Sequence, residues 1–575
     1  MTTPVKNIDI ANIFDRLADL LELEGENPFR VRAYRNAAAT VENLPQNLEE
    51  MVKKGDDLTS LPAIGNDLAQ KINDIVNHKE IDLLKRLEEK NPIDFEELNR
   101  IQGLGPRRIK KLYEILNVQN IDDLYHAAEE QKIRNLPGFS KKIEEHILEE
   151  IKKIKEKYNR MKISTAEQNA LPIVEYLREN RSIQDIEIAG SYRRRKETIG
   201  DLDILVTCED SISVMTHFVN YFDIDEVLSK GDTRSSIILK SGIQVDLRVL
   251  PQKSYGAAML YFTGSKAHNI VIRKLAKQKD WKVNEYGLFS NDDFLAGETE
   301  KGIYNKLGLP YIEPELRENR GEFEAAESGN LPELIKLSDI KGDLHTHTNL
   351  TDGKNTLEEM AEAAQKLGYK YIANTDHSKR VTVAGGLDEI QVFENIKRTD
   401  KLNENFKDFT ILKGIEVDIL EDGSLDLSDK VLKELDIVVG AIHYKFNLSR
   451  EEQTERILRA MDNPYLNILA HPTGRLINER EPYDIDLEKI MQKAKENNCI
   501  LEINSQPSRL DLNDLNSRKA KEMGVKLVIS TDAHSTTQYD FMRFGIGQAR
   551  RGWIEKHNVI NTRNINQLKK IIKRN

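Results

Sequence analysis

The alternation of short apolar runs with amphipathic segments, from residue 336 to the C-terminus, limits more than any other feature how this chain folds. Helical segments such as 356–368 separate several of the runs. Strands that alternate with helices are typical of a parallel sheet, which is either wound open or closed into a barrel. We therefore predict a parallel α/β domain with seven strands, in KGDLHTHT, YKYIANTDH, TILKGIEVDI, IVVGAIH, NILAHP, ILEINS and KLVISTDAH.

Histidines and acidic residues stand at or just after the ends of these runs. The C-terminal strand ends of a parallel barrel converge on one mouth, and side chains two apart on a strand point the same way. One histidine alone is more often a hydrogen-bonded structural residue, but this many, with carboxylates, predict a metal centre. Nitrogen and oxygen ligands suit Mn²⁺, Zn²⁺ or Fe²⁺, and two or three such ions activate water for attack on a phosphate ester. The predicted ligands are His345, His347, Asp352, His377, Glu416, His443, His471, Asp532 and His534.

The segment 190–206, GSYRRRKETIGDLDILV, predicts a second and separate phosphate chemistry. Its Gly-Ser pair follows a strand and suits close approach to a phosphate, and the basic run 193–196 would neutralise a triphosphate. The D-x-D pair puts two carboxylates on one strand face, and a third lies within IQVDLRVL. A lone D-x-D would be an exposed strand edge, but with these neighbours it predicts nucleotidyl transfer with two Mg²⁺. The predicted residues are Gly190 and Ser191 at the phosphate and Asp201, Asp203 and Asp246 as metal ligands.

Residues 1–160 read as helical, with a weak repeat of an apolar stretch, a tight turn and a helix at 58–72, 98–112 and 133–147. The turn GLGPRR is typical of a helix-hairpin-helix, whose backbone N–H groups face DNA phosphates. The net charge of −11 argues against a nucleic-acid partner, but basic stripes at 100–116 and 152–162 are local exceptions, unless they are solvated helix faces. The predicted DNA contacts are Gly103, Gly105, Arg107, Arg108 and Lys110.

Two family resemblances rest on these motifs. HTHTNLTDG, TDHS, GIEVD, AIH, AHP and STDAH resemble the PHP (polymerase and histidinol phosphatase) family, which implies a distorted (β/α)₇ barrel and a trinuclear site on the nine ligands above. The segment 190–206, with SYGAAMLYFTGSKAHN at 254–269, is similar to family X DNA polymerases, the class that includes DNA polymerase beta. Together they make the whole chain resemble a bacterial family X DNA polymerase.

The polymerase resemblance assigns further roles by position. It implies that Ser191 and Arg194 hold the triphosphate, and that the YFTGS motif packs against the incoming sugar. Lys266 stands where beta-type enzymes carry Asp, and a cation there would hold the nucleotide before DNA binds. Lys71 matches a lyase lysine, but Asp67 argues against it because a Schiff base requires a neutral amine. The nucleotide-binding residues are thus expected to be Gly190, Ser191, Arg194, Tyr261, Gly264, Lys266 and Asn269.

The resemblance implies a multidomain α/β chain. We expect an 8-kDa-like helical domain with the first hairpin, a second helical DNA-binding domain, a nucleotidyltransferase palm, a thumb-like nucleotide-selecting domain, a linker and the PHP domain. Their expected bounds are 1–80, 81–160, 161–250, 251–315, 316–335 and 336–575.

The expected function is gap filling in base-excision-type DNA repair, with a PHP-domain 3′–5′ exonuclease that also processes 3′ ends; AP-site processing is left open. The palm would use two Mg²⁺ and the barrel two or three Mn²⁺ or Zn²⁺, on gapped or primer-template DNA with dNTPs. Two cysteines, no apolar run of ~18 residues and no signal-like N-terminus predict a cytoplasmic, nucleoid-associated monomer without a membrane partner. The alternative is a template-independent nucleotidyltransferase whose PHP domain is structural or a small-molecule phosphatase.

Overall fold

The computed structural model describes residues 7–572, apart from 43, 45–47, 62, 79–80, 91–92, 94–97, 99–100, 102–103 and 159. The chain divides into two compact units, one of residues 1–158 and 380–384 and one of residues 159–379 and 385–575. Within the described residues, no helix is both long enough and apolar enough to cross a lipid bilayer.

The first unit is helical and has two hydrophobic cores, one around Phe14 and Ile72 and the other around Leu112 and Ile133. Two of the predicted repeats share a local fold, in which the 3₁₀ turns η1 (Leu58–Ser60) and η2 (Ile133–Asn135) each precede a helix. The helices are α1 (Asn7–Leu23), α2 (Pro28–Glu42), α3 (Leu48–Lys54), α4 (Asn66–His78), α5 (Asp82–Lys90), α7 (Pro106–Leu116), α8 (Ile121–Glu129) and α9 (Lys141–Tyr158).

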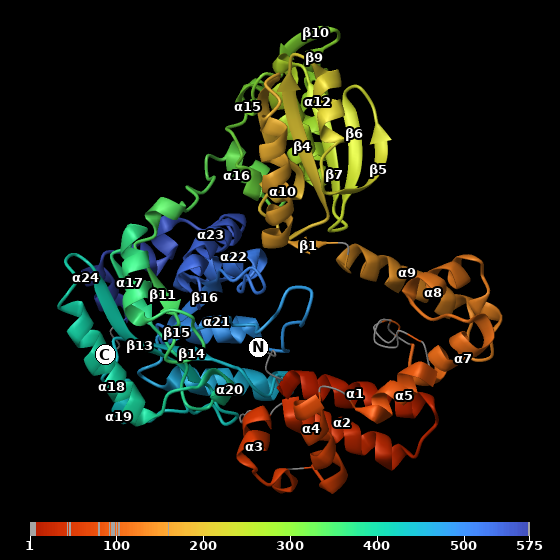
Figure 1. Ribbon diagram of the computed structural model, residues 1–575. Coiled ribbons are helices and arrows are strands. Elements are labelled where there is room, and N and C mark those ends of the chain that lie inside the picture. Colours follow the sequence, from red (N-terminus) through yellow and green to blue (C-terminus); the bar gives the residue numbers. More distant parts are fainter. Residues whose placement is uncertain are drawn as a thin grey trace. The chain divides into compact units, whose positions relative to one another are not determined.

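The second unit begins with a five-stranded sheet in the order β2-β4-β7-β6-β5, in which only the β4–β7 pair is parallel. Alternate residues of β4 face opposite ways: Leu202 and Ile204 pack beneath α10 and α12, whereas Leu205 packs toward α13 (Figure 1). The elements are β1 (Met161–Lys162), α10 (Ile163–Arg178), β2 (Ile183–Ile188), α11 (Gly190–Arg193), β3 (Thr198–Ile199), β4 (Asp201–Cys208), α12 (Ser211–Phe218), β5 (Ile224–Lys230), β6 (Arg234–Leu239), β7 (Gln244–Leu250) and α13 (Tyr255–Thr263).

Residues 316–335, which the sequence predicts as a linker, are packed into the fold rather than extended in solvent. Arg317 is fully buried and donates to Glu300 Oε1 at 2.6 Å. Glu322 is buried as well, and His268 Nδ1 lies 2.8 Å from its Oε1. The surrounding elements are α14 (Lys266–Lys277), β8 (Trp281–Asn284), β9 (Gly287–Ser290), β10 (Asp293–Ala296), α15 (Glu300–Leu307) and α16 (Glu322–Glu327).

From residue 342 the chain forms a seven-stranded parallel sheet in sequence order, β11 to β17, as the alternating pattern predicts. A bridge between Thr346 and Ala533 brings the ends of the first and last strands together, so that the barrel is nearly closed. Its strands are β11 (Gly342–Thr346), β12 (Tyr371–Asn374), β13 (Thr410–Asp418), β14 (Ile437–Ala441), β15 (Ile468–Leu469), β16 (Ile500–Asn504) and β17 (Leu527–Ser530).

Helices surround this barrel, and one of them covers the end at which the strands begin. The period-2 alternation of β14 places Ile437 and Val439 inside with Leu568 and Ile572 of the last helix, while Val438 faces the outer helices (Figure 1). The helices are α17 (Leu357–Lys366), α18 (Glu389–Asn403), α19 (Asp429–Leu432), α20 (Arg450–Asp462), α21 (Leu487–Glu496), α22 (Asp514–Met523), α23 (Met542–Arg551) and α24 (Ile565–Ile572).

Candidate active sites

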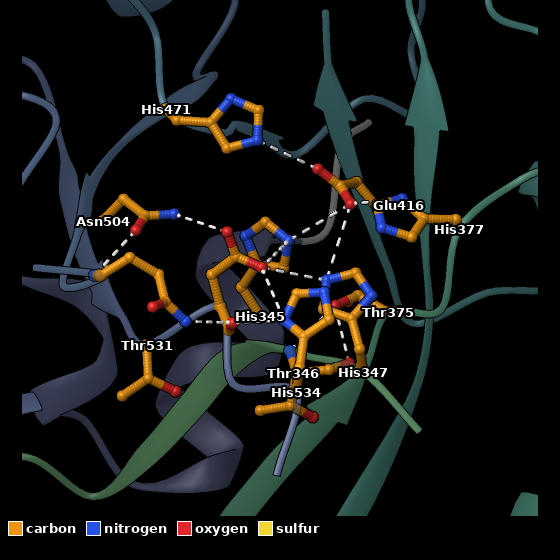
Figure 2. A network of polar contacts seen from close by, with 12 residues as sticks. His345, Thr346, His347, Thr375, His377, Glu416, His471, Asn504, Thr531 and His534 are labelled. Carbon is orange, nitrogen blue, oxygen red and sulfur yellow. Dashed lines mark hydrogen bonds and ion pairs between the residues drawn. The ribbon is translucent and has the colours of Figure 1, made fainter. Parts of the chain in front are cut away.

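The structure brings all nine predicted barrel ligands together at the C-terminal strand ends. Figure 2 shows His345, His347, His377, Glu416, His471 and His534 among them. Each strand end other than that of β16 contributes at least one side chain, and Asp352 comes from the loop before α17. The ligand atoms form three overlapping groups, each within 4.8 Å: His347, Asp352, His377 and His534; His345, His347 and Asp532; and His377, Glu416 and His443.

Glu416 lies at the centre of this cluster and uses both carboxylate oxygens. Its Oε2 is 2.8 Å from His377 Nδ1, whereas its Oε1 is 3.2 Å from His471 Nε2 and 3.5 Å from His443 Nε2. A carboxylate whose two oxygens face different nitrogen groups is arranged as a bridge between two cations. Burial alone would raise the pKa of Glu416, but the neighbouring histidines hold that pKa well below its ordinary value.

The donor set fits metal ions better than it fits internal hydrogen bonding. His345 Nε2 and both ring nitrogens of His347 are buried without a hydrogen-bond partner. Carboxylate oxygens lie close by, with His347 Nε2 at 3.2 Å and His345 Nε2 at 3.6 Å from Asp532 Oδ1. Ligand atoms held tetrahedrally at about 2.1 Å from one ion lie roughly 3.4 Å apart, so the spacing matches a shared cation.

Two acids that the sequence analysis did not single out hold these histidines in place. Glu502 Oε1 is 2.8 Å from His345 Nδ1, and Asp418 Oδ1 is 3.1 Å from His443 Nδ1. Such contacts set the orientation and tautomer of a ligating imidazole. Both had a detectable signal, since Asp418 is two residues from Glu416 on one strand and Glu502 interrupts an apolar strand.

Arg509 adds a cation at the mouth of this site. Its Nε lies 3.9 Å from Asp532 Oδ2, and its side chain is only 19% exposed. The guanidinium therefore places a positive charge beside the acidic part of the cluster.

The sheet of the second unit carries the other predicted constellation. Asp203 on β4 pairs in register with Asp246 on β7, and Asp201 lies on the same face of β4. Burial, with the negative charges of Asp201 and Asp246, raises the pKa of Asp203 to about 7. Three crowded carboxylates are poorly stable as anions on their own, and a divalent cation relieves this repulsion.

A cavity of about 540 Å³ opens beside Asp201 and Asp203. Ser191 Oγ in its wall is buried and has no hydrogen-bond partner, so its hydroxyl is available to donate a hydrogen bond to an oxygen of a bound ligand. All seven predicted nucleotide-binding residues line the cavity: Gly190, Ser191, Arg194, Tyr261, Gly264, Lys266 and Asn269.

The cations of the cavity differ in part from those expected. Lys196 and Arg194 line it, but Arg193 instead forms an ion pair with Glu300 at 2.6 Å, and Arg195 lies over the Tyr192 ring. Of the run 193–196, which the sequence predicts to serve a triphosphate, Arg193 and Arg195 therefore lie outside the cavity lining, because their guanidinium groups have partners elsewhere. Arg160 and Arg273 also line the cavity and were missed; Arg273 is one helical turn after Asn269, a spacing that indicates one helix face.

The hairpin at the start of α7 has the expected local form, with Gly105 as N-cap and Pro106 at the first helical position. Arg107 is exposed, and Arg108 lies over the Phe139 ring at 5.7 Å from its centroid. Lys110 donates to the carbonyl of Leu23 at 2.8 Å, so it links α7 to α1. Gly103 lies outside the described residues, as do the side chains of 152–158.

Lys71 on α4 is half-buried and forms an ion pair with Asp67 at 2.5 Å. Its ammonium also lies 5.9 Å from the centroid of the Tyr34 ring.

Five family models match the chain. They are a helix-hairpin-helix domain at residues 5–81, a SAM-like helix-hairpin-helix tandem at 95–153, the DNA polymerase beta palm at 157–260, the DNA polymerase beta thumb at 258–318 and the PHP domain at 343–506.

Curated relatives agree with this order of domains. The DNA polymerase/3′-5′ exonuclease PolX of Bacillus subtilis (strain 168) is 39% identical over 571 residues, which cover 99% of this chain and 99% of that protein. DNA polymerase lambda of Arabidopsis thaliana is 28% identical over 55% of this chain and 62% of its own length. A probable phosphatase of Thermoanaerobacter sp. (strain X514) is 35% identical over 40% of this chain and 94% of its own length.

Proposed function

The chain belongs to the bacterial family X DNA polymerases that carry a PHP domain, and on this premise we propose that it is a DNA-directed DNA polymerase with a 3′–5′ exonuclease in the same polypeptide. The observation that carries the proposal is the presence of two complete and chemically different acidic centres. One has three carboxylates beside a cation-lined cavity, and the other has nine ligands at the mouth of a barrel.

In the polymerase reaction the primer 3′-hydroxyl attacks the α-phosphate of a dNTP, so that a new P–O bond forms, pyrophosphate leaves and the hydroxyl proton is released to water. Asp201, Asp203 and Asp246 would hold two Mg²⁺, which would supply Lewis-acid stabilisation of the developing charge. The hydroxyl of Ser191 donates a hydrogen bond to a phosphate oxygen, while Arg194 and Lys196 neutralise the triphosphate from the cavity wall. Tyr261 and Gly264 form the part of the wall against which the sugar rests.

In the exonuclease reaction water attacks the terminal phosphodiester of a DNA 3′ end, the P–O bond to the preceding nucleotide breaks, and a nucleoside monophosphate leaves a shortened strand with a 3′-hydroxyl. The nine barrel residues would hold two or three Mn²⁺ or Zn²⁺, which would supply activation of the water and neutralisation of the phosphate charge. Glu502 and Asp418 keep the imidazoles of His345 and His443 oriented, and Arg509 binds a phosphate oxygen at the rim.

The substrates follow from these two sites. The hairpin at Gly105 and Arg107 binds the phosphates of gapped or primer-template DNA. Phosphate contacts carry no base sequence, so the enzyme recognises the shape and the ends of DNA that is under repair. Its location is the nucleoid in the cytoplasm. The Lys71–Asp67 ion pair opposes 5′-dRP lyase activity, because the amine must be neutral to attack. Borohydride should therefore trap no covalent adduct with a 5′-abasic substrate, and an adduct lost in Lys71→Ala would contradict this.

One labelled primer on a gapped template tests both activities, with dNTPs and Mg²⁺ for extension and with Mn²⁺ alone for degradation. Asp201→Ala should reduce extension by about 10³-fold or more and spare degradation, and His443→Ala should do the reverse. Asp225→Ala on the edge strand β5 and His557→Ala are matched controls that should retain both activities. Loss of both activities in either folded active-site variant would contradict the two-site proposal.

The alternative, a template-independent nucleotidyltransferase with a small-molecule phosphatase, is less well supported. The relative that matches along 99% of its length is described as a DNA polymerase with exonuclease activity. Extension that ignores the template base would favour the alternative.

A further inference from the structure

The phosphate-binding turn of the palm, residues 190–197, is supported from behind by the PHP barrel. Within the second compact unit, Ile477, Leu510 and Phe544 of the barrel pack into the same hydrophobic core as α10 and β4. The barrel thus reaches the turn at the base of the nucleotide cavity, and its contacts there are polar and specific.

Arg551, the last residue of α23, makes the most direct of these contacts. It is buried, and its Nη1 donates to the carbonyl oxygen of Arg194 at 2.9 Å and to Glu318 Oε1 at 2.9 Å. Its Nη2 donates to Asp514 Oδ2 at 2.8 Å, which ties the guanidinium to the barrel itself.

Glu318 is shared between Arg551 and the nucleotide site. The same oxygen, Oε1, accepts a hydrogen bond from Arg194 Nε at 3.0 Å, and Arg194 lines the nucleotide cavity. Arg551 therefore takes up part of the negative charge of Glu318 that would otherwise fall on Arg194 alone. The positive potential that Arg194 presents to the cavity is larger as a result.

Two further contacts brace the same turn. Arg475 of the barrel forms a bidentate ion pair with Glu197 at 3.0 and 2.7 Å. Gly547 on α23 approaches Arg195 so closely that an added Cβ would lie 3.2 Å from the Arg195 Cβ. The barrel thus contacts the turn at the backbone carbonyl of Arg194 and at the side chains of Arg195 and Glu197.

We propose that Arg551 of the PHP domain is a positioning residue of the polymerase site, which acts through Glu318 and the carbonyl of Arg194 to aim the Arg194 guanidinium at the dNTP triphosphate. This inference rests on the proposed polymerase function. It gives the barrel a role in nucleotide binding that is separate from its metal centre. Because the contacts act on binding rather than on the reacting atoms, KM for dNTP depends on Arg551 and kcat does not.

The test compares Arg551→Met with the wild type in full-length protein, on a gapped template with Mg²⁺. KM for dNTP should rise about five- to twentyfold, while kcat and the Mn²⁺-dependent degradation of single-stranded DNA stay within about twofold. Arg550→Met is the matched control: Arg550 binds Glu315 at 2.7 Å and the carbonyl of Ile335 at 3.1 Å, outside the turn, and KM should not change.

A double-mutant cycle separates positioning from a general loss of stability. In an Arg194→Met background, Arg551→Met should raise KM by less than about twofold, because no guanidinium remains to be positioned. An undiminished effect in that background, or an unchanged KM in the single variant, would overturn the inference.

Two further outcomes are also decisive. If Arg551→Met does not fold, Arg551→Lys replaces it; its single ammonium cannot reach all three partners, so KM should rise about threefold, and a wild-type KM would refute the role. A wild type that fails to extend primers would instead refute the proposed function, whereas an active wild type with an insensitive Arg551 refutes only this inference.

Discussion

Substitution of Gly190 tests how tightly the backbone of the phosphate turn is placed against the catalytic carboxylates. Gly190 has φ +61°, and a Cβ built on it would lie 2.7 Å from Asp203 Oδ2. Gly190→Ala therefore carries two costs, a left-handed backbone at a non-glycine residue and a clash with a predicted metal ligand.

The two costs have different magnitudes and different consequences. The left-handed conformation costs about 1–2 kcal/mol for alanine and affects only stability. The clash is about 0.7 Å short of the 3.4 Å of ordinary contact, and the short Asp203 side chain relieves it by turning its carboxylate away. A displacement approaching 1 Å at a reacting centre reduces the rate by about 10²-fold, so kcat/KM for extension should fall by that factor.

Gly242 offers a matched control for the backbone term. It lies in the turn between β6 and β7 with φ +83°, and nothing lies within 4 Å of its added Cβ. Gly242→Ala should lose as much stability in denaturant as Gly190→Ala, yet retain primer extension. Exonuclease activity, measured on the same samples, should be unchanged in both.

If Gly190→Ala retains more than about a third of the wild-type kcat/KM, the position of the Asp203 carboxylate does not depend on the absence of a side chain at residue 190. If Gly242→Ala loses as much activity as Gly190→Ala, the loss cannot be assigned to the contact with Asp203. Equal losses of extension and exonuclease activity would indicate general unfolding instead of a local displacement.

Three more predictions concern the ions and the nucleotide. Glu502→Gln removes the charge that orients His345, so metal affinity of the barrel should fall about 10- to 100-fold; exonuclease activity should drop at limiting Mn²⁺ and recover in excess, and a loss independent of Mn²⁺ concentration would contradict this. Because the pKa of Asp203 is raised to about 7, a proton competes with Mg²⁺ below that pH; the Mg²⁺ concentration for half-maximal extension should rise about tenfold per unit as the pH falls below 7 and level off above about 8, whereas a flat titration would exclude Asp203 as a ligand. Lys266→Ala should weaken dNTP binding in the absence of DNA by roughly three- to tenfold in a fluorescence titration, and unchanged affinity would remove Lys266 from that role.

Much of the fold was accessible from local patterns. The seven strands were recognisable because short apolar runs that alternate with helices are typical of a parallel sheet. His443 and Asp532 stand just beyond such runs, and this position was enough to predict that their side chains meet at one end of the barrel. Alternation along β4 likewise separated Asp203 from the core-facing Leu202.

The misses concern partners that are distant in sequence. The polar composition of 316–335 indicated a linker, yet Arg317 is fully buried because Glu300 meets it 17 residues away. The DNA contact of Lys110 stays a prediction, but its hydrogen bond to the Leu23 carbonyl could not be foreseen, because it depends on how two helices pack. A single sequence gives the charge of a residue, but it does not show which distant residue forms an ion pair or a hydrogen bond with it.

The ion pair between Arg317 and Glu300 also affects where a separately expressed fragment of the chain can end. Glu300 binds Arg193 and Arg317 at once, and both guanidinium groups donate to its Oε1. A fragment of the chain that ends at residue 315 would lack Arg317. Glu300 would then keep Arg193 as a counter-ion but lose the second guanidinium, and the space that Arg317 fills would be empty. A fragment that extends to about residue 335 would keep this ion pair and Leu334 of the apolar cluster, but its palm core would still lack Ile477, Leu510 and Phe544 of the barrel.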